Sequence, residues 1–217
     1  MNIEQARFNM IEQQIRPWNV LDTEILELLH MVKREQFVPA AYQNLAFADV
    51  EIPLPGGDVM LAPKFEARIL QELNVKKHET VLEIGTGSGY MAALLAHRAA
   101  KVTSVEINPD NRVLAQKNLA KAGIQNVIVE EGNGALGWDK GAPYDVIVIS
   151  GALEVLPEAI LKQVKVGGRI AAITGQPPVM EFSIITRTGE ASWNPVKVFE
   201  TNIRYLAGAP VPSHFQF

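Results

Sequence analysis

Residues 81–90 constrain the fold of this chain more than any other part of its sequence. They read Val-Leu-Glu-Ile-Gly-Thr-Gly-Ser-Gly-Tyr, so strand-forming residues run directly into a glycine-rich turn, and a helical pattern follows at once. Glycines let the backbone approach a ligand closely, and the start of a helix presents unpaired N–H groups. We interpret the segment as a nucleotide-cofactor loop, with an ordinary tight turn as the alternative.

Strands and helices alternate on both sides of this turn, a pattern that forces a parallel sheet. Strands are predicted at residues 80–84, 101–106, 126–130, 144–150 and 169–174. Helices are predicted at residues 88–98, 108–122 and 157–164, with Asn108 as a start, Gly123 as a stop, and Gly167-Gly168 ending the last helix. Residues 181–187 and 196–203 alternate like half-exposed strands joined by a turn at 188–189, which predicts an antiparallel edge pair. The expected fold class is α/β, a Rossmann-like, doubly wound, mostly parallel sheet with helices on both faces.

The part of the chain before this sheet has a different pattern. Helical spacing is found at residues 3–15, 21–32 and 63–73, with Asp22 and Thr23 as possible caps of the second helix and Pro63 opening the third. Residues 34–63 lose periodicity and gather prolines and glycines, so we expect an irregular segment that contacts substrate. We expect one domain over residues 1–217, with a helical and irregular cap at 1–75 and an α/β core at 76–217.

The spacing of the glycines narrows the identity of the cofactor. The dinucleotide fingerprint G-x-G-x-x-G places its third glycine where this chain has Tyr90, and Gly89 comes one residue early. The next predicted strand ends at Glu106, which stands 21 residues after Gly85 and can accept hydrogen bonds from two ribose hydroxyls. Together these features resemble the S-adenosylmethionine site of class I methyltransferases. The predicted cofactor-binding residues of these two segments are Glu83, Gly85, Thr86, Gly87, Ser88, Gly89, Tyr90, Glu106 and Ile107.

A third candidate segment follows the strand at 126–130. Gly132 and Asn133 stand there, and a small polar side chain between glycines can hydrogen-bond the adenine amino group while leaving room for the ring. A plain turn explains an Asn-Gly pair equally well. Both readings stay open on the sequence.

Composition excludes several other kinds of chemistry. The net charge of −4 argues against nucleic acid as a partner, and the absence of cysteine excludes disulfides, thiolate catalysis and cysteine zinc sites. The four histidines lack metal-ligand spacing, so no metal site is expected. No segment has the apolar length of a membrane span, and the first residues lack the pattern of a secretion signal, so we expect a cytoplasmic protein.

Several further segments, in order along the chain, resemble the protein-L-isoaspartate O-methyltransferase family. They are residues 10–17 (Met-Ile-Glu-Gln-Gln-Ile-Arg-Pro), 34–39 (Arg-Glu-Gln-Phe-Val-Pro), 53–55 (Pro-Leu-Pro), the glycine loop, 137–138 (Gly-Trp), 142–145 (Ala-Pro-Tyr-Asp) and 167–169 (Gly-Gly-Arg). The resemblance covers roughly residues 8 to 175. It implies an enzyme that methylates the free α-carboxylate of isoaspartyl residues in proteins or peptides, which allows succinimide formation and protein repair.

Such a reaction needs no strong base, because the acceptor carboxylate is already an anion near neutral pH. Catalysis is then alignment of the reacting atoms, and no catalytic side chain is expected. One stretch departs from the family, whose Gln-Thr-Ile-Ser carries hydroxyls beside the substrate carboxylates. This chain has Asp58-Val59-Met60-Leu61, which makes Asp58, Val59 and Leu61 the acceptor-site candidates. The family's acidic residue at the adenine position is replaced by Asn133.

Three functional hypotheses follow: an isoaspartyl methyltransferase, a methyltransferase acting on a more apolar acceptor, and a catalytically weak S-adenosylmethionine-binding relative. Arg34 and Lys64 either offset the charge of an acceptor carboxylate or are solvated at the surface. The apolar segment 209–217 is expected to dock on the body of the protein or on a second subunit, so we expect a monomer or a homodimer.

Overall fold

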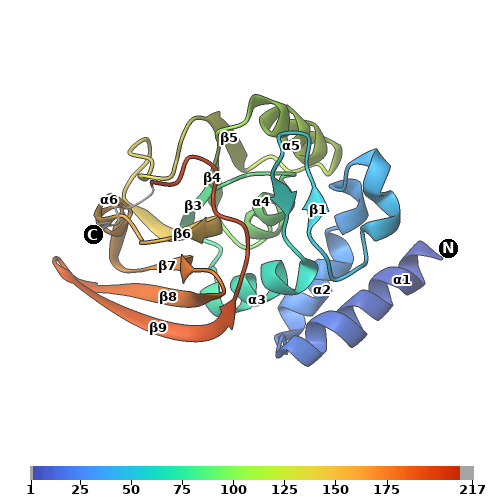
Figure 1. Cartoon of the computed structure of the whole chain (residues 1–217), viewed down its shortest axis with the longest axis horizontal. Coiled ribbons are helices and arrows are strands. Elements are labelled where there is room, and N and C mark those ends of the chain that lie inside the picture. Colours follow the sequence, from blue (N-terminus) through green and yellow to red (C-terminus); the bar gives the residue numbers. More distant parts are fainter. Residues whose placement is uncertain (1, 211–217) are drawn as a thin grey trace, which may run out of the picture.

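A sheet of seven strands forms the centre of the computed structural model, which describes residues 2–210 (Figure 1). Its strands are β3 (Thr80–Ile84), β4 (Lys101–Glu106), β5 (Val127–Glu131), β6 (Tyr144–Leu153), β7 (Val164–Gln176), β8 (Val179–Gly189) and β9 (Ser192–Thr201). The spatial order is β5-β4-β3-β6-β7-β8-β9; the first five are parallel and the last two pair antiparallel at one edge. The predicted fold class is confirmed.

The order of the strands creates a switch point beside β3. From β3 the chain builds outward through β4 to β5, and it then returns to place β6 on the opposite side of β3. In open α/β sheets the crevice at the carboxyl ends of such a pair is where ligands bind. The glycine-rich turn follows β3 at this end of the sheet.

Helices cover both faces of the sheet, because side chains of each strand alternate between them. Val146 and Val148 of β6 belong to the larger core, which also holds buried residues of α3 (Pro63–Leu73), α4 (Tyr90–Ala96) and α5 (Pro109–Lys121). Ile147 and Ile149 belong to the second core, together with Ile160 of α6 (Glu158–Lys162). The near-continuous apolar run of β6 thus packs on two sides.

The predicted start and stop residues of several helices are confirmed. The Asn108 side chain accepts hydrogen bonds from the backbone N–H groups of Asp110 (2.9 Å) and Asn111 (3.3 Å), and the chain leaves α5 through Gly123 at φ +72°. Asp22 caps α2 (Thr23–Met31) in the same way, and Pro63 stands at the first position of α3.

Several sequence-based boundaries differ from the structure. The helical span expected at 3–15 has those bounds but is divided into α1 (Ile3–Met10) and a π-helical turn at Ile11–Ile15, and a 3-10 turn at Arg16–Trp18 that contains Pro17 follows it. Strand β7 begins at Val164, before Gly167-Gly168, because Val164 already pairs with Tyr144. The β8–β9 connection lies between Gly189 and Ser192, beyond the turn expected at 188–189.

The segment expected to be irregular at 34–63 is also partly regular. It contains 3-10 turns at Arg34–Gln36 and Ala40–Leu45 and a short antiparallel hairpin of β1 (Ile52–Pro53) and β2 (Val59–Met60). The backbone N–H of Leu54 donates to the carbonyl of Asp58 over 2.9 Å, and Gly57 takes φ +81° in the turn between them. Gly57 is one of the glycines on which the prediction of an irregular segment rested, and its positive φ allows the hairpin to turn.

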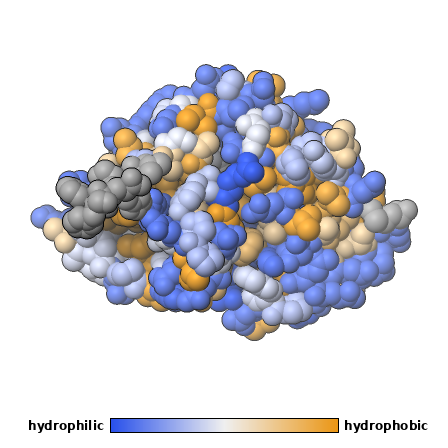
Figure 2. Space-filling model, in the orientation of Figure 1, coloured by the Kyte–Doolittle hydropathy of each residue, from blue (hydrophilic) through white to orange (hydrophobic). Residues whose placement is uncertain are grey.

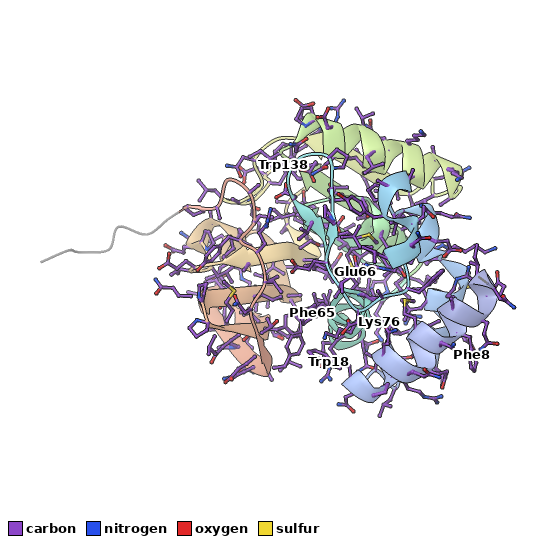
Figure 3. The ribbon with its side chains drawn as sticks, turned by 45° about the vertical axis from the view of Figure 1, so that its right-hand side comes forward. Phe8, Trp18, Phe65, Glu66, Lys76 and Trp138 are labelled. Carbon is purple, nitrogen blue, oxygen red and sulfur yellow. The ribbon has the colours of Figure 1, made fainter. Side chains whose placement is uncertain are left out.

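The N-terminal helices pack against the antiparallel edge of the sheet through an aromatic cluster. Trp18 lies edge-on to Phe65 of α3 and to Phe199 of β9, with ring centroids 5.3 and 5.4 Å apart, and Figure 3 shows Trp18 and Phe65 as neighbours. Lys64 covers the Trp18 ring from 4.6 Å. The N-terminal residues and the sheet therefore share one core.

The surface view shows hydrophilic and hydrophobic side chains interspersed over one face (Figure 2). Within residues 2–210, no helix combines the length and the apolar character that crossing a bilayer requires. The docking prediction concerns the apolar segment 209–217. Residues 211–217 of this segment lie outside the described residues.

Candidate functional site

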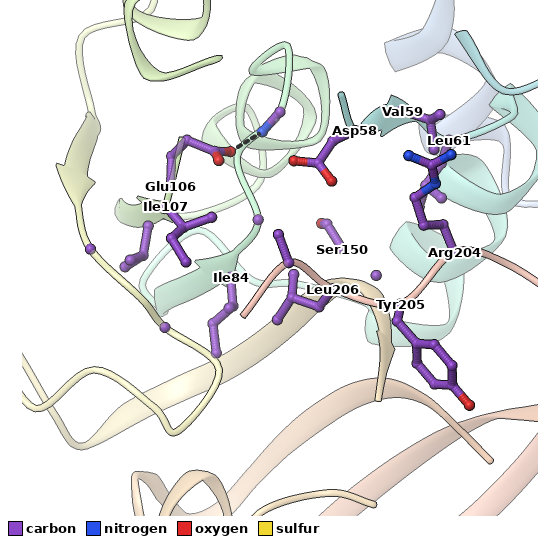
Figure 4. Close-up of a pocket in the computed structure, with 17 residues that line it drawn as sticks. Asp58, Val59, Leu61, Ile84, Glu106, Ile107, Ser150, Arg204, Tyr205 and Leu206 are labelled. Carbon is purple, nitrogen blue, oxygen red and sulfur yellow. Dashed lines mark hydrogen bonds between the residues drawn. The ribbon is translucent and has the colours of Figure 1, made fainter. Parts of the chain in front are cut away.

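A pocket opens to solvent at the carboxyl ends of β3, β4 and β6 (Figure 4). The walls come from the β1–β2 hairpin, the glycine turn, the ends of the neighbouring strands and a C-terminal strap, residues 204–208, that crosses the opening. Lining residues are Asp58, Val59, Leu61, Ile84, Gly85, Gly87, Val105, Glu106, Ile107, Gly132, Gly134, Ser150, Gly151, Arg204, Tyr205, Leu206 and Ala207.

Two glycines of the turn keep this pocket open. Gly85 has φ +92°, and a Cβ added there would lie 2.9 Å from Leu206 Cδ1 of the strap. Gly87 has φ +54°, and its added Cβ would lie 3.1 Å from Leu54 Cδ1 of the hairpin. Positive φ strains any side chain at these positions, and the two leucine side chains would also have to shift to make room for a Cβ. At these two positions the turn therefore lines the pocket with backbone.

Glu106 ends β4 with its carboxylate in the pocket. Its Oε2 accepts a hydrogen bond from the backbone N–H of Gly87 (2.8 Å), and its Oε1 accepts one from the backbone N–H of Asn108 (2.9 Å). Burial raises the pKa of the Glu106 carboxyl above its usual value, and the charge of Asp58 acts in the same direction. Each carboxylate oxygen has a second lone-pair site, so both can still accept a ribose hydroxyl.

The third predicted segment lies beside Glu106. The backbone N–H of Gly132 donates to the carbonyl of Glu106 over 2.9 Å, and Gly132 and Ile107 both line the pocket. Asn133 is outside the lining: its Oδ1 accepts from the N–H of Ala135 (2.9 Å), and its Nδ2 donates to the carbonyl of Gly208 (3.1 Å). The Asn133 side chain thus fixes the strap, and its contact with adenine stays a prediction.

Several other predicted cofactor residues lie behind the turn. Glu83 is fully buried, and its two carboxylate oxygens accept from the hydroxyls of Ser104 (2.5 Å) and Ser150 (3.3 Å). Burial raises the pKa of Glu83 to about 8, so the side chain keeps its proton at neutral pH. Thr86 Oγ1 lies 2.6 Å from Ser104 Oγ in the same network. Glu83 supports the turn from the side of the sheet and lines a smaller adjoining pocket, which shares Gly85, Gly87 and Ser150 with the first pocket.

Ser88, Gly89 and Tyr90 also lie outside the pocket lining. The carbonyl of Ser88 accepts from Asn118 Nδ2 (2.9 Å), Gly89 precedes the first residue of α4, and the buried Tyr90 ring packs 5.4 Å from Phe37. Their direct contact with a cofactor stays a prediction. The structure places them where they hold α4 against its neighbours.

Arg34 and Lys64 have structural roles in place of the acceptor role considered for them. Arg34 is fully buried, forms an ion pair with the buried Glu66, and donates to the carbonyl of Leu61 over 2.7 Å. Lys64 pairs with Asp49 over 2.6 Å. Neither cation lines the pocket. Arg34 is also not solvated at the surface, the other alternative considered for it, because its carboxylate partner Glu66 is buried with it.

The three acceptor-site candidates all line the pocket. Asp58, Val59 and Leu61 come from the β1–β2 hairpin and the residue after it. The buried Leu61 also belongs to the larger core, as Met60 does. Figure 4 shows the Asp58 carboxylate directed into the pocket. The hairpin thus presents one carboxylate and two apolar side chains at the mouth.

The strap is the part of the site that sequence reasoning missed. Ala152 at the end of β6 donates its N–H to the carbonyl of Arg204 (3.0 Å) and accepts from the N–H of Leu206 (2.8 Å). The Arg204 guanidinium donates to the carbonyl of Gly57 in the hairpin. Nothing in the spacing of residues 204–207 indicates a ligand. Ser150 and Gly151 have a usable signal, since they stand at the carboxyl end of a predicted parallel strand.

Comparison with known proteins identifies a family whose sequences this chain matches. The model of the family described as "Protein-L-isoaspartate(D-aspartate) O-methyltransferase (PCMT)" matches residues 5–205. A protein-L-isoaspartate O-methyltransferase of Methanoculleus marisnigri is 37% identical over 193 residues, which cover 88% of this chain and 88% of that protein. Protein-L-isoaspartate O-methyltransferase 2 of Pelobacter propionicus is 34% identical over 209 residues, covering 96% and 93%.

Solved structures agree with the fold. A protein-L-isoaspartate O-methyltransferase structure superposes with a TM-score of 0.77 at 24% identity, covering 95% of this chain and 66% of that one. A putative protein-L-isoaspartate O-methyltransferase from Plasmodium falciparum, solved in complex with S-adenosyl-L-homocysteine, gives a TM-score of 0.80 at 16% identity, covering 95% and 98%.

Proposed function

The chain belongs to the protein-L-isoaspartate(D-aspartate) O-methyltransferase family, and on that basis we propose that it transfers the methyl group of S-adenosylmethionine to the free carboxylate of isoaspartyl residues in proteins and peptides. The observation that carries the proposal is the joining of Glu106 to the glycine turn at the switch point of the sheet. This arrangement supports a ribose-binding role for Glu106 beside an open backbone cradle.

The residues of the pocket fit the methyl donor. S-adenosylmethionine supplies a methyl group that is activated by the positive sulfur to which it is bound. Glu106 would hold the ribose, the backbone at Gly85 and Gly87 would border the amino-acid end, and Ile107 and Gly132 would border the adenine. The two turn glycines leave the space that a Cβ would fill.

The acceptor side of the reaction needs positioning more than proton transfer. An isoaspartyl carboxylate is ionised at neutral pH, so its oxygen can form a bond to the methyl carbon while the carbon–sulfur bond breaks and its electron pair stays on sulfur. No proton moves in this step. The hairpin and the strap border the pocket on two sides and are joined through Arg204, so they would restrict the position of an acceptor.

Arg204 supports an anionic acceptor. It carries the one positive charge among the described residues that line the pocket, and it stands at the mouth beside the hairpin (Figure 4). A guanidinium has five N–H donors, and Arg204 donates from Nη1 to the carbonyl of Gly57. Its remaining donors suit a carboxylate, in place of the hydroxyls that the hairpin lacks.

Val59 and Leu61 favour a second candidate, a methyltransferase whose acceptor is more apolar than an isoaspartyl residue. Both side chains line the pocket where the family resemblance leads one to expect hydroxyls. An apolar wall lowers the cost of burying an apolar acceptor and offers no hydrogen bond to a carboxylate.

A methyl-transfer assay distinguishes the two candidates. The full chain is incubated with labelled S-adenosylmethionine and either an isoaspartyl peptide or the normal aspartyl peptide of the same sequence, and calorimetry measures binding of S-adenosylmethionine alongside. We expect label in the isoaspartyl peptide only. Binding of the donor without transfer to that peptide would support the second candidate or a binding protein. Absence of donor binding would refute both candidates.

A further inference from the structure

Asp58 is an acidic residue in a pocket that already holds one carboxylate. Its hairpin is fixed against the start of α5, where the N–H of Gly56 donates to Asn111 Oδ1 (3.2 Å) and Asn108 Nδ2 donates to the carbonyl of Gly56 (3.4 Å). Arg204 holds the other side of the turn through the carbonyl of Gly57. These contacts place the Asp58 carboxylate over the pocket, on the side of Glu106 (Figure 4).

The charges in this pocket are unbalanced. Asp58 forms no ion pair within the described part of the chain, although Arg204 lines the same pocket. Burial is the main cause of the raised pKa of the Glu106 carboxyl, and the negative charge of Asp58 also raises it. The two carboxylates therefore interact. Two facing carboxylates repel each other, and a cation bound between them removes the repulsion. The pocket therefore favours a ligand with positive charge near Asp58.

The methyl donor and its product differ in the transferred methyl group and in the charge on sulfur. S-adenosylmethionine carries a sulfonium, an ammonium and a carboxylate, whereas S-adenosylhomocysteine has a neutral thioether in place of the sulfonium. The sulfur is attached to the 5′ carbon of the ribose, so a ribose held by Glu106 would bring the sulfur into the pocket that Asp58 also lines. A carboxylate in this position interacts with the donor more strongly than with the product.

We propose that Asp58 makes this enzyme prefer the charged methyl donor to the neutral product. Its carboxylate attracts the sulfonium, so it promotes donor binding and exchange of product for donor. The inference rests on the donor half of the proposed function and does not depend on the identity of the acceptor. The same negative charge repels an anionic acceptor. The positive charge of Arg204 at the mouth of the pocket offsets this repulsion.

Calorimetry on the full chain tests this inference without any acceptor. The ligands are S-adenosylmethionine, S-adenosylhomocysteine and sinefungin, which has an amine-bearing carbon in place of the methylated sulfur and is cationic there. In Asp58→Asn we expect the affinities for S-adenosylmethionine and sinefungin to fall about fivefold to tenfold and the affinity for S-adenosylhomocysteine to stay within about twofold. The loss is expected to shrink as salt is raised.

Two further variants serve as controls. Glu106→Gln removes a group that faces the ribose, which all three ligands share, so it should weaken all three to a similar degree. Asp110→Asn removes an exposed carboxylate in the first turn of α5, outside the pocket lining, and should leave all three affinities unchanged. Thermal unfolding of each variant checks the fold.

Equal losses for donor and product in Asp58→Asn, or no loss for either, would overturn the role of Asp58 while leaving the proposed function intact. Failure of the wild-type chain to bind either ligand would overturn both. Donor binding without methylation of isoaspartyl peptides would affect only the acceptor half of the proposed function.

Discussion

The backbone N–H of Gly87 donates a hydrogen bond to Glu106 Oε2 over 2.8 Å, so the glycine turn after β3 and the acid that ends β4 are fixed to each other. The two segments are separated in sequence by helix α4. Their junction lies where the strand order reverses, and it defines the position of the proposed donor site.

Gly87→Val is expected to abolish donor binding. A side chain at φ +54° strains the backbone, and its Cβ would stand 3.1 Å from Leu54 Cδ1 at the edge of the pocket. Gly123→Val is the matched control, because Gly123 has φ +72° with open space around its Cβ position. Calorimetry should show lost S-adenosylhomocysteine binding in the first variant and retained binding in the second. An unchanged dissociation constant for Gly87→Val would remove the turn from the site.

Arg204→Ala is expected to raise KM for an isoaspartyl peptide about tenfold, because a hydrogen bond to a charged group is lost at a partly solvated site. Arg204→Lys keeps the charge without the planar fork and should recover part of the loss. The affinity for S-adenosylhomocysteine should change much less than KM in both, because Arg204 stands at the mouth of the pocket. Initial-rate kinetics and calorimetry measure these quantities, and an unaltered KM in Arg204→Ala would place the acceptor carboxylate elsewhere.

Val59→Thr combined with Leu61→Ser is expected to raise kcat/KM for the isoaspartyl peptide about tenfold, since each change returns a hydroxyl to the pocket wall. The single variants separate the two contributions. Leu61 is buried, so Leu61→Ser will also lower the free energy of unfolding, and urea denaturation must confirm that the variant is folded under assay conditions. A folded double variant without increased activity would favour the more apolar acceptor.

Glu83 is expected to make the protein less stable as the pH rises. Its pKa is about 8 in the folded state, far above the value of 4.5 for an exposed glutamate, so the folded state binds this proton more tightly than the unfolded state does. The contribution of Glu83 to the free energy of unfolding is therefore complete below pH 4.5 and is lost as the pH rises through 8. Between pH 6 and pH 8 the loss should be about 2 kcal/mol.

Glu83→Gln keeps the hydrogen bonds to Ser104 and Ser150 possible but cannot ionise. Urea denaturation of wild type and variant at both pH values measures the difference directly. We expect the stability of the variant relative to wild type to increase by the same amount over this interval. A constant difference would show that Glu83 does not titrate as described.

Some features of the protein follow from local pattern alone. The bounds of β3 and β4 agree with prediction to the residue, because each is an apolar run with sharp polar or glycine boundaries. Asn108 and Gly123 bound α5 for reasons that are complete within a few residues of chain. The hairpin β1–β2 and the early start of β7 were not predicted. Both depend on pairing with other strand residues that cannot be identified from the local sequence pattern.

Local pattern was enough to predict the parallel sheet, the glycine turn and the acid at position 106, because strand periodicity, glycine conformation and the carboxyl-end rule are local or topological. Other relationships exist only in the folded protein: Arg34 pairs with Glu66 in the interior, Asn133 holds the strap, and Asp58 and Arg204 line one pocket. These relationships join segments that are distant along the chain, and their energies arise from burial and charge that exist only after those segments have packed together.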